Sequence, residues 1–94
     1  MLKTLEDLIK IIRERKSSSD DSSYTSKLLK DKSLSLGKVK EEIGELIEAV
    51  ENNSNKVHEA ADVLYHLLVY LEGNGVRIED IMNELEKRKK KKES

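Results

Sequence analysis

The chain has 94 residues and a formal net charge of −1, with 39% charged and 3% aromatic residues and no Pro, Cys, Trp or Phe. This length suits a single small domain, residues 1–94, which a second copy would help to stabilise, and the near-neutral charge gives no overall preference for nucleic acid. The composition favours long amphipathic helices over a β-sandwich and excludes disulfides and thiolate metal sites, so carboxylates or the two His must hold any metal.

The first predicted helix covers residues 4–16, where apolar residues recur on one face: Leu5, Leu8, Ile9 and Ile12. Thr4 and Asp7 have the spacing of an N-terminal capping arrangement. Residues 17–26 are rich in Ser and Asp, whose side chains compete for backbone hydrogen bonds, and they predict a loop. A short helical turn over 26–31 is expected to follow.

Two strongly periodic helices form the centre of the sequence. The first covers 34–52 and repeats its apolar residues at helical spacing: Val39, Ile43, Leu46, Ile47 and Val50. Asn-rich residues 52–55 predict a turn, and the second helix covers 56–72 before GNG at 73–75 ends it. The short turn predicts that these two helices pair antiparallel.

A last helix is expected over 78–90, with a frayed basic tail over 87–94. Lysine runs of this kind are usually solvated and suit a helix C-terminus. The short connections favour an antiparallel bundle of four to five helices. The sequence contains no apolar run long enough for a bilayer, and its N-terminus is unlike a secretory signal, so we expect a cytoplasmic protein.

Acidic residues lie close to the apolar faces of both central helices. At 100° per residue, Glu42 and Glu45 flank the apolar face of the first, and Glu41 and Glu48 fall on the far side. The second helix collects three side chains in one stripe: Glu59, Asp62 and His66. Antiparallel pairing can bring the pair Glu42 and Glu45 to the same level along the helices as the pair Glu59 and Asp62.

Two interpretations of these acids follow from the spacing. Four converging carboxylates suit an octahedral Mg²⁺ with water or phosphate oxygens in the remaining positions. Alternatively, the acids are exposed to solvent on the flanks of the two helices, where nearby Lys side chains balance their charge. His66 is a candidate ligand, base or hydrogen-bond partner, or simply a core His satisfied by a neighbour. Tyr65 and Tyr70 either pack in the core with the hydroxyl in contact with water, or stack on a nucleotide base.

The spacing EExxE at 41–45, followed by ExxD at 59–62, resembles the metal-binding signature of the MazG-like all-α nucleoside-triphosphate pyrophosphatases. Two further stretches, SYTSKLL at 23–29 and EAADVLYHLLVYL at 59–71, resemble segments of the phosphoribosyl-ATP pyrophosphatase family of histidine biosynthesis. The resemblance continues through GNGVRIEDIMNEL at 73–85. One difference is Lys40, which stands where related sequences usually have Gly.

This resemblance implies hydrolysis of the α–β phosphoanhydride of phosphoribosyl-ATP, giving phosphoribosyl-AMP and pyrophosphate. It implies that Mg²⁺, or Mn²⁺, is held by four acids: Glu42, Glu45, Glu59 and Asp62. Glu41 or Glu45 is the candidate to accept the proton of the attacking water. The family is also similar in forming homodimers that complete a shared bundle, so the expected partners are the substrate and a second copy, not nucleic acid or a membrane.

The stretch SYTSK supplies hydroxyls, backbone amides and an ammonium that could bind phosphate: Ser23, Tyr24, Thr25 and Lys27. By itself the stretch is an ordinary loop before a short helix, and only the resemblance favours contact with substrate, for these residues and for His66. Arg13 and Arg15 either reach the same polyanion or pair with Glu14, Asp20 or Asp21 across solvent.

Two other functions remain open at this point. A housekeeping pyrophosphatase for canonical or damaged nucleotides would use the same four acids, because the metal motif is indifferent to base and sugar. A non-enzymatic helical interaction module would use the Leu and Ile faces for a coiled-coil-like dimer and the acids as rim charges.

Overall fold

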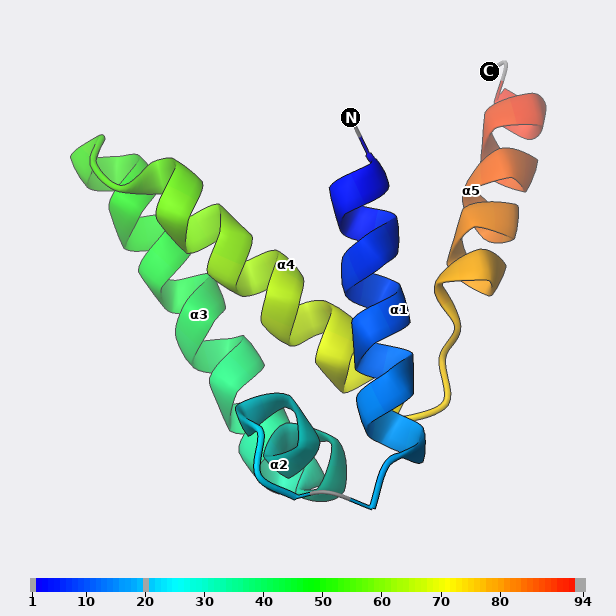
Figure 1. Cartoon of the computed structure of the whole chain (residues 1–94). Helices are drawn as coiled ribbons and strands as arrows, with labels where there is room; N and C mark the ends of the chain where they lie inside the picture. The colour runs from blue at the N-terminus through cyan, green and yellow to red at the C-terminus, as the bar shows by residue number, and fades with distance from the viewer. Residues whose placement is uncertain (1, 20, 93–94) are drawn as a thin grey trace.

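The computed structural model describes residues 2–19 and 21–92, and within them the chain is all-α. Its helices are α1 (Lys3–Ser17), α2 (Tyr24–Lys30), α3 (Lys32–Asn52), α4 (Lys56–Gly73) and α5 (Ile78–Lys92). Figure 1 shows α3 and α4 as a long antiparallel hairpin, with α1 and α5 beyond its base. The predicted all-α fold and the antiparallel pairing of the central helices are therefore confirmed.

The helix boundaries follow from local capping, which corrects the prediction in three places. Ser23 accepts a hydrogen bond from the Ser26 amide at 3.0 Å, so α2 begins at Tyr24 and the expected loop is shorter. Asp31 caps α3 in the same way through the Leu34 amide at 3.0 Å. The predicted cap of the first helix is wrong, because Thr4 lies inside α1 and Asp7 pairs with Lys3 at 3.1 Å.

The end of α5 and the turn between α3 and α4 are also defined. Helix α5 continues through Lys92, into the basic tail for which the sequence suggested fraying, and residues 93–94 lie outside the described part. The hairpin turn places Asn53 and Asn55 in the left-handed region, at φ 54° and 55°. Asn adopts this conformation more readily than most residues, so the sequence signal at 52–55 has a direct backbone reason.

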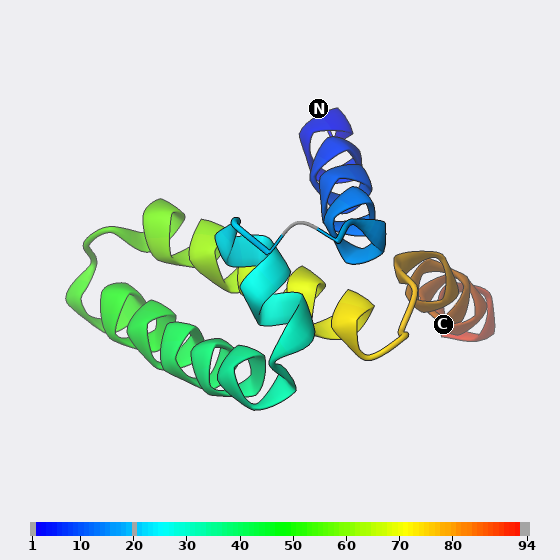
Figure 2. The ribbon, with the colours of Figure 1, turned by 60° about the horizontal axis from the view of Figure 1, so that its bottom comes forward.

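Helix α4 is the centre of the molecule and contacts each of the other helices. The buried apolar cluster forms where its C-terminal half meets α1 and α2, from Ile9, Ile12, Leu28, Leu68 and Val69. Figure 2 shows this junction beside the short α2, with the α3–α4 hairpin extending away from it. The core of the chain thus lies at one end of the hairpin.

The buried stripe of α3 differs from the predicted apolar face. Residues of the stripe recur at steps of four, three and seven: Ser35, Val39, Glu42 and Ala49. Ile43, Ile47 and Val50, which were expected to be buried, are exposed. Because α4 packs on the stripe that contains Glu42, an acid occupies the seam between the helices and the bulky aliphatic residues face outward.

A charged clamp joins α1, α4 and α5. Arg13 donates to Glu72 Oε2 from Nη2 at 2.8 Å and to Glu79 Oε1 from the same nitrogen at 2.7 Å. Lys16 donates to the backbone carbonyl of Glu72 at 2.6 Å. Arg13 thereby compensates the buried carboxylate of Glu72, a group that would be costly to bury alone. Arg13 thus pairs with acids, but with Glu72 and Glu79 instead of the acids near it in sequence that were expected.

The helices of the described part include none that is both long and apolar enough to cross a membrane.

Candidate metal and nucleotide site

The first acidic group lies on α3. Single carboxylate oxygens of Glu41, Glu42 and Glu45 all lie within 4.8 Å of one another. Glu42 is only 8% exposed, and its Oε1 atom is buried without a hydrogen-bond partner in the described chain. Glu41 is exposed, as expected for a residue on the far side of the helix, but its long side chain lets the carboxylate reach the group.

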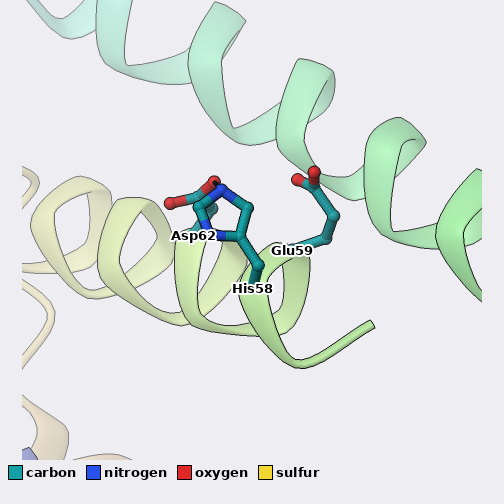
Figure 3. A group of neighbouring side chains, drawn as sticks. All are labelled: His58, Glu59 and Asp62. Atoms are coloured by element: carbon teal, nitrogen blue, oxygen red, sulfur yellow. Dashed lines mark ion pairs between the residues drawn. The ribbon is translucent and has the colours of Figure 1, made fainter. Parts of the chain in front are cut away.

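The second group lies on the facing helix α4, where ligand atoms of His58, Glu59 and Asp62 also approach within 4.8 Å of one another. Figure 3 shows the His58 ring beside Asp62, while Glu59 extends toward the neighbouring α3. His58 Nε2 lies 3.4 Å from Asp62 Oδ2, and the Glu59 Oε1 atom is buried without a hydrogen-bond partner among the described residues. The sequence prediction missed His58, although its position one turn before Asp62 was a usable signal.

The two groups influence each other electrostatically. The pKa of Glu45 is raised, chiefly by the negative charge of Glu42 and then by desolvation. The negative charge of Glu59, across the seam on α4, adds to this rise of the Glu45 pKa. Glu45 and Glu59 also line one hollow of about 330 Å³ near the hairpin turn, together with Glu48. The structure therefore brings acids of α3 and α4 together across the seam.

This arrangement fits a hard divalent cation. Two buried carboxylate oxygens lack partners within the described residues, one from each helix, and a buried carboxylate that is neither paired nor bound to a metal is expensive. The donors are oxygen atoms, the ligands that Mg²⁺ and Mn²⁺ prefer. Exposed His58 adds one nitrogen at the edge of the α4 group.

A ring cluster links α2 to α4 next to the acids. Tyr24 stacks near Tyr65, with ring centroids 6.4 Å apart, and its hydroxyl lies 3.1 Å from His66 Nε2. The Thr25 hydroxyl forms a short hydrogen bond with the hydroxyl of Tyr65. His66 is 7% exposed. The observed role of His66 is thus that of a hydrogen-bonded core residue, whose partner Tyr24 is half-exposed.

The remaining predicted substrate-binding residues have different surroundings. The Ser23 hydroxyl caps α2 and also donates to Ser26 Oγ at 2.9 Å, so it already has a structural role. Lys27 is exposed on α2. The burial of the Tyr24 hydroxyl raises its pKa, and the charges of Glu42 and Glu41 add to this rise. Tyr24 is therefore the member of the SYTSK stretch that the α3 acids influence electrostatically.

Residues 5–89 match the family described as phosphoribosyl-ATP pyrophosphohydrolase. The chain belongs to this family. Among its relatives, a phosphoribosyl-ATP pyrophosphatase of Methylobacterium nodulans is 45% identical over 93 residues, which cover 90% of this chain and 82% of that protein. A phosphoribosyl-ATP pyrophosphatase of Methanobrevibacter smithii is 34% identical over 90 residues, which cover 90% of this chain and 93% of that protein.

The phosphoribosyl-ATP pyrophosphohydrolase family also includes longer proteins. The histidine biosynthesis bifunctional protein HisIE of Thermotoga maritima is 40% identical over 92 residues, which cover 89% of this chain but only 44% of that protein. The resemblance drawn from EExxE, ExxD and SYTSKLL is therefore confirmed at the level of the family.

Proposed function

We propose that this chain is a phosphoribosyl-ATP pyrophosphatase, which hydrolyses the α–β phosphoanhydride of phosphoribosyl-ATP to phosphoribosyl-AMP and pyrophosphate in histidine biosynthesis. Family membership supports the substrate and the reaction. The observation that carries the chemistry is the buried, unpartnered oxygen of Glu42 among the acids of the α3–α4 seam. A soluble biosynthetic role agrees with a cytoplasmic location, which is part of the proposal.

The proposed cofactor is Mg²⁺, with Mn²⁺ as a substitute, held by Glu42, Glu45, Glu59 and Asp62. The bound cation would neutralise phosphate oxygens and align the attacked phosphorus for in-line displacement. The attacking water gives up one proton to a carboxylate of the protein. This general base is Glu41, which is exposed at the edge of the α3 group, and Glu45 is the alternative. The side of the site that receives the nucleotide is formed by residues of α2, its cap and α4: Ser23, Tyr24, Thr25, Lys27 and His66.

The direct test is to incubate the protein with phosphoribosyl-ATP, with and without Mg²⁺, and to measure pyrophosphate and phosphoribosyl-AMP. We expect release of both products only with Mg²⁺. Faster cleavage of dUTP, dCTP or ATP would support a housekeeping pyrophosphatase instead. A folded protein without any of these activities would favour an interaction module.

Metal binding is tested separately by thermal melting. A ligand at 100 times its Kd that binds only the folded state adds about 2.7 kcal/mol to the unfolding free energy. Mg²⁺ should therefore raise the Tm of the wild type but not of Glu59→Gln. An equal rise in both proteins would exclude Glu59 as a ligand.

The proposal includes a homodimer. Aliphatic residues are exposed on both helices of the hairpin: Ile43, Ile47, Val50, Val57 and Leu64. Each such side chain gains about 1.5 to 3 kcal/mol when it becomes fully buried, so a second copy can cover this surface and complete a four-helix bundle. Light scattering should give a dimer for the wild type and a monomer for Ile47→Asp. The control is Ile11→Asp, on an exposed position of α1, which should remain dimeric.

A further inference from the structure

The hydrogen bonds around His66 determine whether the Tyr24 hydroxyl donates or accepts in its contact with that ring. His66 Nδ1 lies 2.8 Å from the backbone carbonyl oxygen of Asp62, which only accepts, so Nδ1 carries the hydrogen and donates it. In the neutral ring, Nε2 then accepts from the Tyr24 hydroxyl at 3.1 Å. The hydroxyl proton of Tyr24 is used in this bond, and its oxygen retains lone pairs for another donor.

A charged donor beside the α3 acids is the ammonium group of Lys38, on the same helix. Lys38 Nζ lies 3.5 Å from Glu41 Oε1. Its pKa is raised, chiefly by the charge of Glu41, with a smaller contribution from Glu42. In the opposite direction, Lys38 partly offsets the rise in the Tyr24 pKa. The ammonium therefore lies beside the α3 acids.

The contact between Lys38 and Glu41 is loose. Charge-assisted N–H···O bonds are typically about 2.7 to 2.9 Å long, and the ammonium is 3.5 Å from the carboxylate. A flexible Lys with three donors can exchange such a partner at little cost. A polyphosphate carries several negative charges and meets only acids on the metal side of the seam, so it needs a cation beside them.

We propose that Lys38, placed beside the α3 acids by its contact with Glu41, binds a non-bridging phosphate oxygen of the substrate or of the pyrophosphate product. This inference rests on the proposed pyrophosphatase function and adds a residue outside the SYTSK stretch. Lys38 leaves Glu41 when the phosphate binds, which frees that carboxylate to accept a proton. The competing explanation of the Lys38–Glu41 contact is a solvated ion pair between residues three apart on the helix, which would contribute little to stability.

The experiment compares Lys38→Met with Lys40→Met, which removes the same charge two residues away on an exposed part of α3. A hydrogen bond from a charged donor corresponds to about a tenfold or larger effect. At saturating Mg²⁺, Lys38→Met should therefore raise the KM for phosphoribosyl-ATP at least about tenfold, and Lys38→Arg should restore most of the loss. Lys40→Met should match the wild type. Equal KM values for Lys38→Met and the wild type, or equal increases in both Met variants, would overturn the inference.

A binding measurement gives a second readout that does not need turnover. Calorimetry with pyrophosphate and Mg²⁺ should show weaker pyrophosphate binding in Lys38→Met and unchanged binding in Lys40→Met. If Lys38 only balances Glu41, its removal should strengthen Mg²⁺ binding and leave pyrophosphate affinity unchanged, which would contradict the proposal. A wild type that binds pyrophosphate but does not cleave phosphoribosyl-ATP would refute the proposed function alone.

Discussion

At the junction of α1, α2 and α4, Ile12 and Val69 are fully buried, whereas in the α3–α4 hairpin Ile47 is 54% and Val57 85% exposed. The hairpin nevertheless buries the carboxylate of Glu42. The junction follows the usual rule that apolar side chains are buried and charged ones are exposed. The hairpin reverses this rule, because it exposes aliphatic side chains and buries a carboxylate. The comparison indicates that the junction stabilises the single chain. The buried acid and the exposed aliphatic residues of the hairpin are the features that support the proposed cation in the seam and the proposed second copy.

The largest expected effect concerns the acid in the seam. Glu42→Gln should lower turnover of phosphoribosyl-ATP by at least about 100-fold, because a charged metal ligand contributes several kcal/mol to transition-state stabilisation. Without metal, the same variant should melt at a higher temperature than the wild type, since it removes an unpartnered buried charge. Pyrophosphate release and thermal melting check the two parts.

The matched control is Glu51→Gln, an exposed acid near the end of the same helix. It should leave both turnover and melting nearly unchanged. Glu48 is less suitable as a control because it lines the hollow that contains Glu45 and Glu59. Equal activity of the Glu42 and Glu51 variants would remove the seam from the proposed site.

The second prediction compares the two apolar regions directly. Ile12→Ala should reduce the free energy of unfolding by about 2 to 5 kcal/mol, because it leaves a cavity at the junction. Ile47→Ala should cost less than about 1 kcal/mol at concentrations where dimers dissociate. Denaturant unfolding at low and high protein concentration measures both. A loss for Ile47→Ala that is large and independent of concentration would mean that the hairpin surface is covered within one chain.

A smaller effect is expected where α5 joins the junction. The guanidinium of Arg13 lowers the pKa of Glu79 from its usual 4.5 to about 2. A carboxyl whose pKa is lowered on folding contributes stability above its unfolded pKa and loses it as pH falls toward the folded value. The Tm difference between the wild type and Glu79→Gln should therefore be present at pH 6 and vanish between about pH 4.5 and 2. Glu14→Gln, another exposed acid, serves as the control, and a difference independent of pH would contradict the assignment.

The smallest effect is expected for His58, at the exposed edge of the α4 group. His58→Gln should leave Mg²⁺-dependent turnover within about twofold, because Mg²⁺ prefers oxygen ligands. Binding of Co²⁺ or Zn²⁺, which accept imidazole more readily, should weaken. Calorimetric titration with each metal separates the two cases. A large loss of Mg²⁺ affinity would make His58 part of the main ligand set.

Periodicity alone determined that this chain is all-α, where its helices lie to within a few residues, and that α3 and α4 pair antiparallel. These features depend on apolar spacing, turn residues and short connections, all of which are local. The spacing of EExxE and ExxD also singled out the acids of α3 and α4, because residues three or four apart on a helix are neighbours whatever the helix packs against.

Tertiary structure decided which stripe of each helix faces its neighbour. The sequence placed Ile43, Ile47 and Val50 inside, but α4 packs against the stripe of Ser35, Val39, Glu42 and Ala49 and leaves those aliphatic residues exposed. It also decided the partners of Arg13 and the contact of the Tyr24 hydroxyl with His66. These contacts join residues whose proximity or side-chain direction depends on packing, which helical periodicity does not specify.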